Sequence, residues 1–298
     1  MNAPGGYRPG MLPLFWGKRG EQTVAEKLSH GAPRDGENVR GIDTSVPNPA
    51  RVYDYLLGGK DNYEVDRVTA QAGMGAFPKI VKSARASRAF LARVVRYLAG
   101  EAGIRQFLDV GAGLPSARNV HEIAQDVAPS SKIVYVDNDP VVLVHARALL
   151  MSTPEGVTDY VEADMRDPEK ILREAARTLD LREPVAVLAL GVLHFIEGDE
   201  AAAAIVRSLL AATPQGSYLG ICHLTADFYP QMTELARRVN ERQHNAPMIL
   251  RDRERVARFF DGLEIVPPGL VQVSKWRPDS DLEAAAPAAL WGGVARKT

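Results

Sequence analysis

Three features are scarce in this sequence: cysteine, long apolar runs and net charge. Its one cysteine, Cys222, excludes an internal disulfide and favours a reducing compartment, for which we expect the cytoplasm. The longest apolar run, 185–192, falls far short of the roughly 20 residues that span a bilayer, and Lys18, Arg19 and Glu21 interrupt the apolar cluster near the N-terminus. We therefore predict neither a membrane span nor a signal peptide. Because 36 basic and 37 acidic residues leave a charge of −1, no overall field attracts nucleic acid or an anionic membrane.

The composition that remains is that of a folded globular protein, with 46% hydrophobic and 24% charged residues. The length of 298 residues exceeds the roughly 100 to 200 residues of a typical domain, so we expect either one large α/β domain with additions or two small domains. Residues 1–40 mix Gly, Pro and charge without a hydrophobic period, which predicts a mobile leader. We expect 41–100 to form an N-terminal helical cap segment and 101–298 to form the main domain.

Helix signals are clear in the cap segment. Asn48 suits an N-cap, Pro49 the first helical position and Gly58 the stop, which predicts a helix over 49–57. A second, amphipathic helix is predicted over 83–99, and the residues 60–63 between them are predicted to form a polar turn.

The main domain repeats a strand followed by a helix. Apolar runs occur at 106–110, 132–136, 158–162, 185–191 and 217–222, and each is followed by a helical pattern. This alternation predicts an α/β fold, a doubly wound parallel sheet with helices on both faces. After a helix over 252–260 that Asp252 caps, strands are predicted at 263–266, 271–276 and 290–296, with an antiparallel pair at the end.

A glycine-rich turn follows the first predicted strand, at the edge where open α/β sheets bind ligands. Gly111 and Gly113 allow the backbone to approach a ligand, although such a turn also occurs without one. Pro115 replaces the third glycine of a dinucleotide site, and because proline has no N–H it weakens the binding of a pyrophosphate. Asp109 adds a carboxylate that favours a cationic ligand group and disfavours NAD.

The second and third predicted strands also end in carboxylates. Asp137 stands where it can accept two hydrogen bonds from a ribose diol. Asp164 can accept from an adenine amino group, and the backbone N–H of Met165 can donate to a ring nitrogen. Because buried acids need partners, three successive acidic strand ends indicate one neutral or cationic ligand that contacts all three.

These motifs resemble class I S-adenosylmethionine-dependent methyltransferases. The wider sequence is similar to one bacterial family of them, catalogued as a domain of unknown function. The segments that carry the resemblance include IDTSVPNPARVYDYLLGGKDNY (42–63), 106–150 with its LDVGAGLP, YVEADMRDP (160–168), VLHFI (192–196), 259–271, 276–278 and 292–297. The resemblance implies a Rossmann-like, seven-stranded sheet with an antiparallel last strand, and so identifies 101–298 as the methyltransferase domain.

The resemblance also implies S-adenosyl-L-methionine as the donor, lying across the ends of the first four strands. Its amino acid portion would meet Asp109, Gly111 and Gly113, its ribose Asp137 and its adenine Asp164 and the Met165 amide, with Asn138 flanking the adenosine.

Candidates for a catalytic base follow from what methyl transfer requires. The reaction is an in-line displacement, so the protein aligns the nucleophile, excludes water and in some cases removes a proton. His194, His223 and Tyr55 are the candidates, although a structural histidine is an alternative at both positions. Tyr53 and Tyr55 point to different faces of a helix, so at most one of them lines the pocket. Arg51 is interpreted as a solvated charge, with a contact to a ligand carboxylate as the alternative.

The acceptor is predicted to be a small molecule. The arginines of 252–260 form a solvated basic face beside Glu254 and Asp261, so no nucleic acid is expected, and Cys222 without neighbouring ligands predicts no metal. A donor-binding protein without methyl transfer stays open as an alternative, because fold does not guarantee activity. A nicotinamide dehydrogenase is a third hypothesis, which Pro115 and Asp109 oppose.

Overall fold

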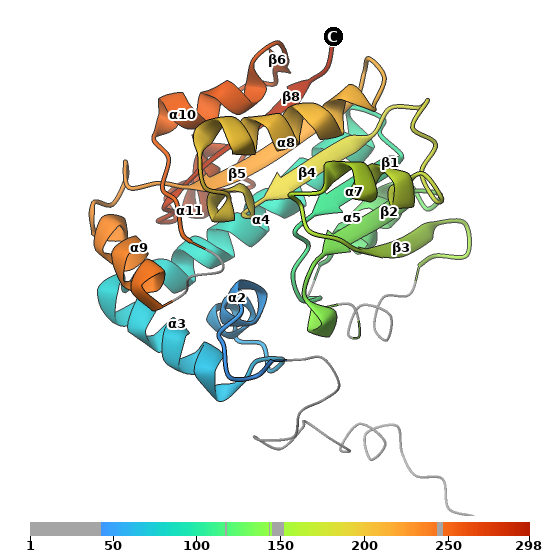
Figure 1. Cartoon of the computed structure of the whole chain (residues 1–298). Helices are drawn as coiled ribbons and strands as arrows, with labels where there is room; N and C mark the ends of the chain where they lie inside the picture. The colour runs from blue at the N-terminus through green and yellow to red at the C-terminus, as the bar shows by residue number, and fades with distance from the viewer. Residues whose placement is uncertain (1–42, 117, 143, 145–151, 243–246) are drawn as a thin grey trace, which may run out of the picture. The chain divides into compact units, whose positions relative to one another are not determined.

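The computed structural model describes residues 43–298, apart from 117, 143, 145–151 and 243–246. The leader predicted over 1–40 lies outside the described residues. In the described part, a mixed sheet of eight strands lies between two layers of helices (Figure 1).

The sheet has the doubly wound order that the sequence predicts. Its strands follow the spatial order β3-β2-β1-β4-β5-β8-β6, and β7 also pairs with β8. The parallel strands are β1 (Gln106–Val110), β2 (Lys132–Asp137), β3 (Val157–Glu162), β4 (Ala186–Leu190) and β5 (Tyr218–Leu224). Antiparallel pairs join β8 (Leu290–Arg296) to β5, to β6 (Glu264–Ile265) and to β7 (Val271–Gln272). The α/β fold class and its antiparallel last strand are therefore confirmed.

The sheet has eight strands and not the expected seven, and the difference lies at the outer edge of β8. This edge pairs with β6 and then β7, two short segments separated by Pro267 and Pro268, which cannot donate to a ladder. The strand predicted over 271–276 ends at Gln272, and a 3₁₀ turn over Val273–Lys275 follows. This turn carries Trp276 into the core, where its ring centroid lies 5.6 Å from that of Phe90. Burial of a large aromatic side chain therefore outweighs the four further residues of strand that the sequence predicts.

Helices cover both faces of the sheet. Side chains from α7 (Pro168–Ala175), α8 (Asp199–Ala211) and α10 (Arg253–Ala257) share one apolar core with Leu108 and Val134. Side chains from α4 (Ile80–Gly100) and α5 (Val120–Val127) share the other with Phe107 and Ile133. Because successive strand residues alternate faces, Asp109 points to the side of α4 and α5. No described helix combines the length and the apolarity of a membrane span.

The cap, defined here as residues 43–76, contains two helices. The first, α2 (Pro49–Leu57), begins where Asn48 Oδ1 accepts from Ala50 N at 2.8 Å. The second, α3 (Glu64–Ala76), is not predicted by the sequence, because its Gly73 and Gly75 lower helix propensity. It packs through Gly73 beside Leu235 of α9 (Gln231–Arg242). In Figure 1 the two cap helices lie on the side toward which the arrowhead of β4 points.

The boundary predicted at residue 100 stays a prediction. Within 41–100, α4 belongs to the core of the sheet, since Phe90, Val94 and Leu98 on it are fully buried. A short helix, α11 (Asp281–Ala284), completes the elements near the C-terminus, and the strand predicted over 290–296 is confirmed at both ends.

Candidate functional site

Backbone hydrogen bonds tie the loop after β1 to the end of β2. Gly111 N donates to Val136 O at 2.8 Å, and Gly113 N donates to Asp137 Oδ2 at 2.8 Å. Both glycines have a positive φ, and a Cβ on Gly111 would lie 2.4 Å from Val192 Cγ2. Around Gly113 the nearest atom to such a Cβ is the Cβ of Ala50 at 4.0 Å. Gly111 is therefore required for packing, whereas Gly113 leaves its backbone open to approach.

The ends of β2 and β3 are joined by side chains. Asp164 Oδ2 accepts from Asn138 Nδ2 at 3.3 Å, and its Oδ1 accepts from Arg166 N and Nε. Burial acts to raise the pKa of Asp164, but the hydrogen bonds and charge of Arg166 outweigh it and lower the pKa. Asp137 differs, because burial raises its pKa despite hydrogen bonds from Asp139 N and Gly113 N. Met165 is buried in the core beside Asp164.

Asp109 lies deeper, in register with Tyr135 of β2, which is itself in register with Tyr160 of β3. These three residues line a small pocket together with Arg88, Gly113 and other residues of the loop and of α5. Burial raises the pKa of Asp109 to about 7, the Arg88 charge opposes this rise and the Asp137 charge adds to it. A carboxyl group with such a pKa gains from any cation that enters the pocket.

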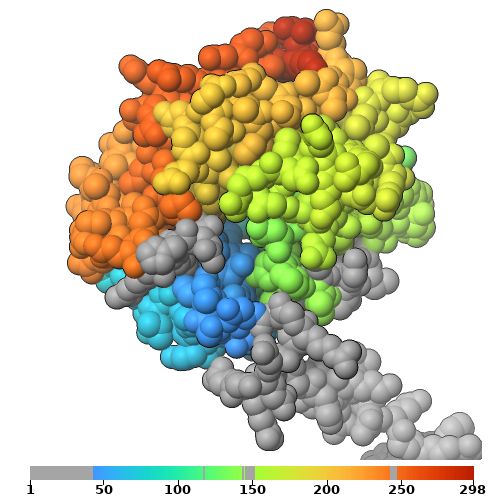
Figure 2. All heavy atoms as spheres, in the orientation of Figure 1, coloured from blue at the N-terminus to red at the C-terminus, as the bar shows by residue number. Residues whose placement is uncertain are grey.

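The cap borders this edge of the sheet. Ala50 of α2 packs against Leu114 in the loop after β1 and against Val141 and Val142 after β2. In Figure 2 the blue surface of the cap adjoins the green surface of these loops. Residues of the cap are therefore part of the wall of the site.

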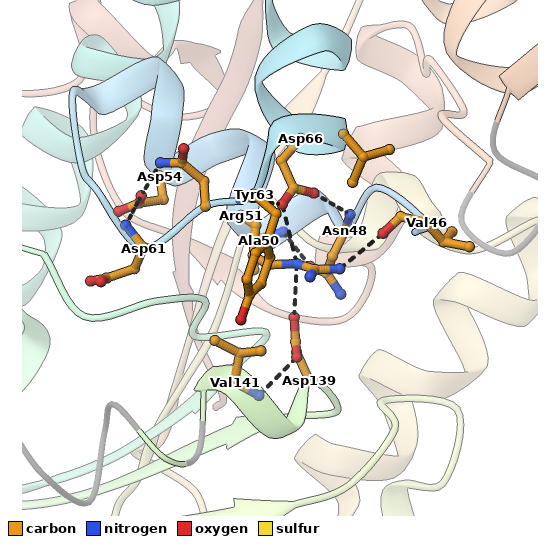
Figure 3. Close-up of polar contacts among 12 residues, drawn as sticks. Val46, Asn48, Ala50, Arg51, Asp54, Asp61, Tyr63, Asp66, Asp139 and Val141 are labelled. Carbon is orange, nitrogen blue, oxygen red and sulfur yellow. Dashed lines mark hydrogen bonds and ion pairs between the residues drawn. The ribbon is translucent and has the colours of Figure 1, made fainter. Parts of the chain in front are cut away.

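Arg51 joins the cap to the strand ends (Figure 3). The sequence interpretation of a solvated charge is wrong for Arg51, which is only 4% exposed. Its Nε lies 3.5 Å from Asp66 Oδ2 and 3.7 Å from Asp139 Oδ2, and its Nη2 donates to Val46 O at 3.0 Å. The ring of Tyr63 lies 5.2 Å from its guanidinium carbon. Sequence reasoning missed both Asp66 and Asp139, and only the second carries a signal, as the next acid after Asp137.

The ends of β4 and β5 hold histidines. His223 of β5 is fully buried, its Nδ1 lies 2.8 Å from Leu224 O and its Nε2 lies 2.9 Å from Arg251 Nη1. Since arginine only donates, Nε2 accepts and Nδ1 donates. Burial, assisted by the Arg251 charge, lowers the pKa of His223 to about 3. Both ring nitrogens are thus engaged in the fold, which favours the structural alternative at this position.

His194 follows β4 in the 3₁₀ turn Leu193–Phe195 and is also buried. Its Nδ1 has no hydrogen-bond partner among the described residues. Burial lowers its pKa well below the usual value, and the charges of His223 and Arg251 add to this. The imidazole is therefore neutral at physiological pH.

Arg251 lies beside these histidines, next to the ends of β4 and β5. It is fully buried and donates to Asp199 Oδ1 at 2.9 Å and to the carbonyl oxygens of Leu193, Ile196 and Gly198 at 2.9 to 3.1 Å. Nothing in its sequence surroundings distinguishes Arg251 from an exposed loop arginine, so sequence reasoning missed it.

Comparison with known proteins identifies the chain. Residues 35–298 match a family described as S-adenosyl methyltransferase. The protein belongs to this family. The methyltransferase is similar to the crystal structure of a DUF574 family protein from Streptomyces avermitilis, with 48% identity, a TM-score of 0.82 and coverage of 86% of this chain and 99% of that one. It is also similar to a candidate methyltransferase from Thermobifida fusca, with 40% identity, a TM-score of 0.80 and coverage of 87% and 98%. Among curated proteins no relative matches.

The residues at the carboxyl end of β1 and in the loop that follows it suit S-adenosyl-L-methionine, the methyl donor of this family. The open backbone of Gly113 admits a close ligand, and an ammonium or sulfonium group near the buried carboxyl of Asp109 would add positive charge that favours its ionised form. Pro115, without an N–H, lines the same pocket and offers nothing to a diphosphate. The methyltransferase therefore contains the kind of site that its donor needs.

The side chains of Tyr53 and Tyr55 in the methyltransferase bond to different parts of the structure, as their spacing predicts. The Tyr53 hydroxyl donates to Ala84 O at 3.1 Å, and burial raises the pKa of Tyr53 to about 12. The Tyr55 hydroxyl accepts from Gln71 Nε2 at 3.2 Å within the cap. Among the residues that the structure describes, no group of three or more metal-binding side chains lies together.

Proposed function

We propose that this methyltransferase transfers the methyl group of S-adenosyl-L-methionine to a small-molecule acceptor, with the donor held along the carboxyl ends of β1, β2 and β3. The observation that supports this best is the set of bonds that joins Asp137 to Gly113 and Asp164 to Asn138, because they hold the loop after β1, the end of β2 and the loop after β3 together at one edge. The donor supplies an electrophilic methyl group on a sulfonium.

The proposed roles of the binding residues follow the position of each strand end. Asp109, with Gly111 and Gly113, contacts the amino acid portion of the donor, since the buried carboxyl suits an ammonium group. Asp137 accepts from the ribose hydroxyls, and Asn138 flanks the adenosine. Asp164 and the Met165 amide bind the adenine. Asp137 and Asp164 can fill these roles because an ionised carboxylate accepts more hydrogen bonds than the protein supplies to them.

Of the three candidate bases, His194 has the strongest support. It follows β4 and has one ring nitrogen without a partner, whereas both nitrogens of His223 are engaged. Tyr55 stays a weaker candidate, because its hydroxyl bonds within the cap. A neutral imidazole is the form that accepts a proton, so the lowered pKa of His194 keeps it in the required state.

A small-molecule acceptor accords with the pairing of Arg255 of α10, one of the arginines predicted to form a solvated basic face. Arg255 forms an ion pair with Asp199 at 2.6 Å instead of standing free for a polyanion. We also propose the cytoplasm as the location, on the grounds that the lone Cys222 is a buried thiol.

Calorimetry with S-adenosylhomocysteine tests the donor site. We expect the parent to bind, and expect Asp137→Ala and Asp164→Ala each to weaken binding by about 1 to 3 kcal/mol, the cost of hydrogen bonds lost in a partly buried site. Asp180→Ala is the matched control, because Asp180 bonds Arg182 and lies beside Gln106 at the opposite edge of the sheet. No binding at millimolar ligand refutes the function, whereas unchanged affinity in both variants refutes the placement of ribose and adenine.

A further inference from the structure

Arg51 is a buried cation whose donors are only partly used. Two of its nitrogens, Nε and Nη1, and one oxygen of Asp139, Oδ2, are buried without a hydrogen-bond partner among the described residues. Leaving a charged donor unpaired in the interior costs free energy, so such an arrangement calls for an explanation. The two groups face each other with Nε 3.7 Å from Oδ2, just beyond bonding distance (Figure 3).

Asp66 holds the arginine from the side of the cap. Its Oδ1 accepts from Asn48 N at 2.8 Å and its Oδ2 accepts from Tyr63 N at 2.9 Å, so this carboxylate fixes the start of α2 and of α3 together. Each oxygen therefore already accepts one hydrogen bond where Arg51 Nε lies 3.5 Å from Oδ2. Arg51 Nη2 donates within the cap, to Val46 O, and Nε also faces Asp139 Oδ2, outside the cap.

Asp139 connects the arginine to the proposed donor residues. Its backbone N donates to Asp137 Oδ1 at 3.0 Å, and Asp137 Oδ2 in turn accepts from Gly113 N. The Oδ1 atom of Asp139 accepts from Val141 N at 2.9 Å, which leaves Oδ2 for Arg51. Asp139 is thus in contact with Asp137 on one side and with Arg51 of the cap on the other.

We propose that Arg51 is a positioning residue that couples the cap to donor binding through Asp139; this inference rests on the proposed function. A charge-assisted N–H···O bond has a length of about 2.7 to 2.9 Å, so the pair needs a shift of about 1 Å to form one. When a donor engages Asp137, the turn that carries Asp139 adjusts and the Arg51–Asp139 bond closes. By linkage, a closed bond strengthens donor binding as much as the donor strengthens the bond.

The test combines donor affinity with protection of the cap. Asp139→Asn keeps an oxygen for Val141 N but removes the charge, and Arg51→Gln removes the guanidinium. We expect each to weaken S-adenosylhomocysteine binding roughly 10-fold in calorimetry, within the range of ordinary coupling between sites. The double variant is expected to be no weaker than either single one, because both break the same bond. In hydrogen exchange, amides of 43–76 gain protection on binding in the parent and not in Asp139→Asn.

Arg93→Gln is the matched control. Arg93 is buried to the same extent as Arg51, but it binds Trp276 O, Val273 O and Glu283 away from the strand ends. We expect this variant to lose stability and keep the affinity of the parent. If Arg51→Gln does not fold, the isosteric Asp139→Asn alone decides.

The outcomes separate the inference from the function beneath it. A parent that binds no S-adenosylhomocysteine refutes the proposed function and this inference with it. A parent that binds, with both variants equal to it, refutes only the coupling. Additive losses in the double variant also refute it, because they mean that Arg51 and Asp139 act on the donor separately.

Discussion

At the ends of β2 and β3 the charged groups include carboxylates that accept from backbone N–H groups, whereas after β4 and β5 they are two buried histidines and an arginine that donates to carbonyl oxygens. Asp137, half-buried at the end of β2, accepts from two backbone N–H groups. Arg251 holds three carbonyls, an aspartate and an imidazole in the interior. The first arrangement can exchange partners with a ligand, and the second cannot without breaking the fold.

This contrast shows what a polar residue at a strand end signifies. A carboxylate near the surface keeps unused acceptor capacity, since each ionised carboxyl has about four lone-pair sites. A buried histidine between an arginine and a carbonyl has none left. The acidic half of the edge is therefore suited to a ligand, and the histidine half chiefly supports the sheet.

The largest expected effect tests the structural role of Arg251. Arg251→Met keeps the apolar stem but leaves Ile196 O, His223 Nε2 and the Asp199 carboxylate without this donor and removes one of two donors from Leu193 O and Gly198 O, so we expect the free energy of unfolding to fall by about 3 to 5 kcal/mol. Urea unfolding measures it. Arg255→Met is the control, because Arg255 shares Asp199 but is 35% exposed, and should cost at most about 1 kcal/mol. Equal losses in the two variants would contradict the supporting role of Arg251 after β4 and β5.

The next largest effect concerns Asp109, the buried acid of β1. Because the pKa of Asp109 rises from 3.8 to about 7 on folding, the native state binds the extra proton between these values, and the free energy of unfolding falls as pH rises through them. Asp109→Asn removes this fall, so we expect its stability relative to the parent to increase by roughly 3 kcal/mol between pH 4 and 7.5.

Urea titrations at several pH values check the behaviour of Asp109. Asp180→Asn should show no such trend above pH 4, since hydrogen bonds from Arg182 lower the pKa of Asp180 to about 2 and its contribution changes only below pH 4. If the difference in free energy of unfolding between Asp109→Asn and the parent does not change with pH, Asp109 is ionised throughout and paired with Arg88.

Local signals account for most of the fold that the sequence predicts. The helix over 49–57 is bounded by Asn48 and Gly58, and the strands at 106–110 and 290–296 by their own apolar runs, so each is decided by near neighbours. The helix α3 is different, because its glycines oppose it and Leu235 of α9 supports it from a distant part of the chain. The end of β7 is decided in the same way, by the burial of Trp276.

The same division applies to the site. Three aspartates could be placed at one edge because parallel strands end on the same side, whatever the rest of the chain does. Arg51 and Arg251 could not be recognised, since their burial depends on Asp139 and Asp199, which lie far from them in the sequence. The sequence of a buried arginine does not differ from that of an exposed one.

The smallest expected effect separates the two neighbouring histidines, whose ring centroids lie 5.8 Å apart. Replacing His223 by Leu leaves a proton of Arg251 Nη1 without its acceptor, and we expect a loss of about 1 to 3 kcal/mol in the free energy of unfolding. Replacing His194 by Leu removes a buried Nδ1 that has no described partner, so the change should stay within about 1 kcal/mol. Urea unfolding at pH 8 measures both, because each imidazole is then neutral in the folded and unfolded states. A larger loss in His194→Leu would assign His194 to the supporting network; a stable variant that binds donor but has lost methyl transfer would assign it to the reaction.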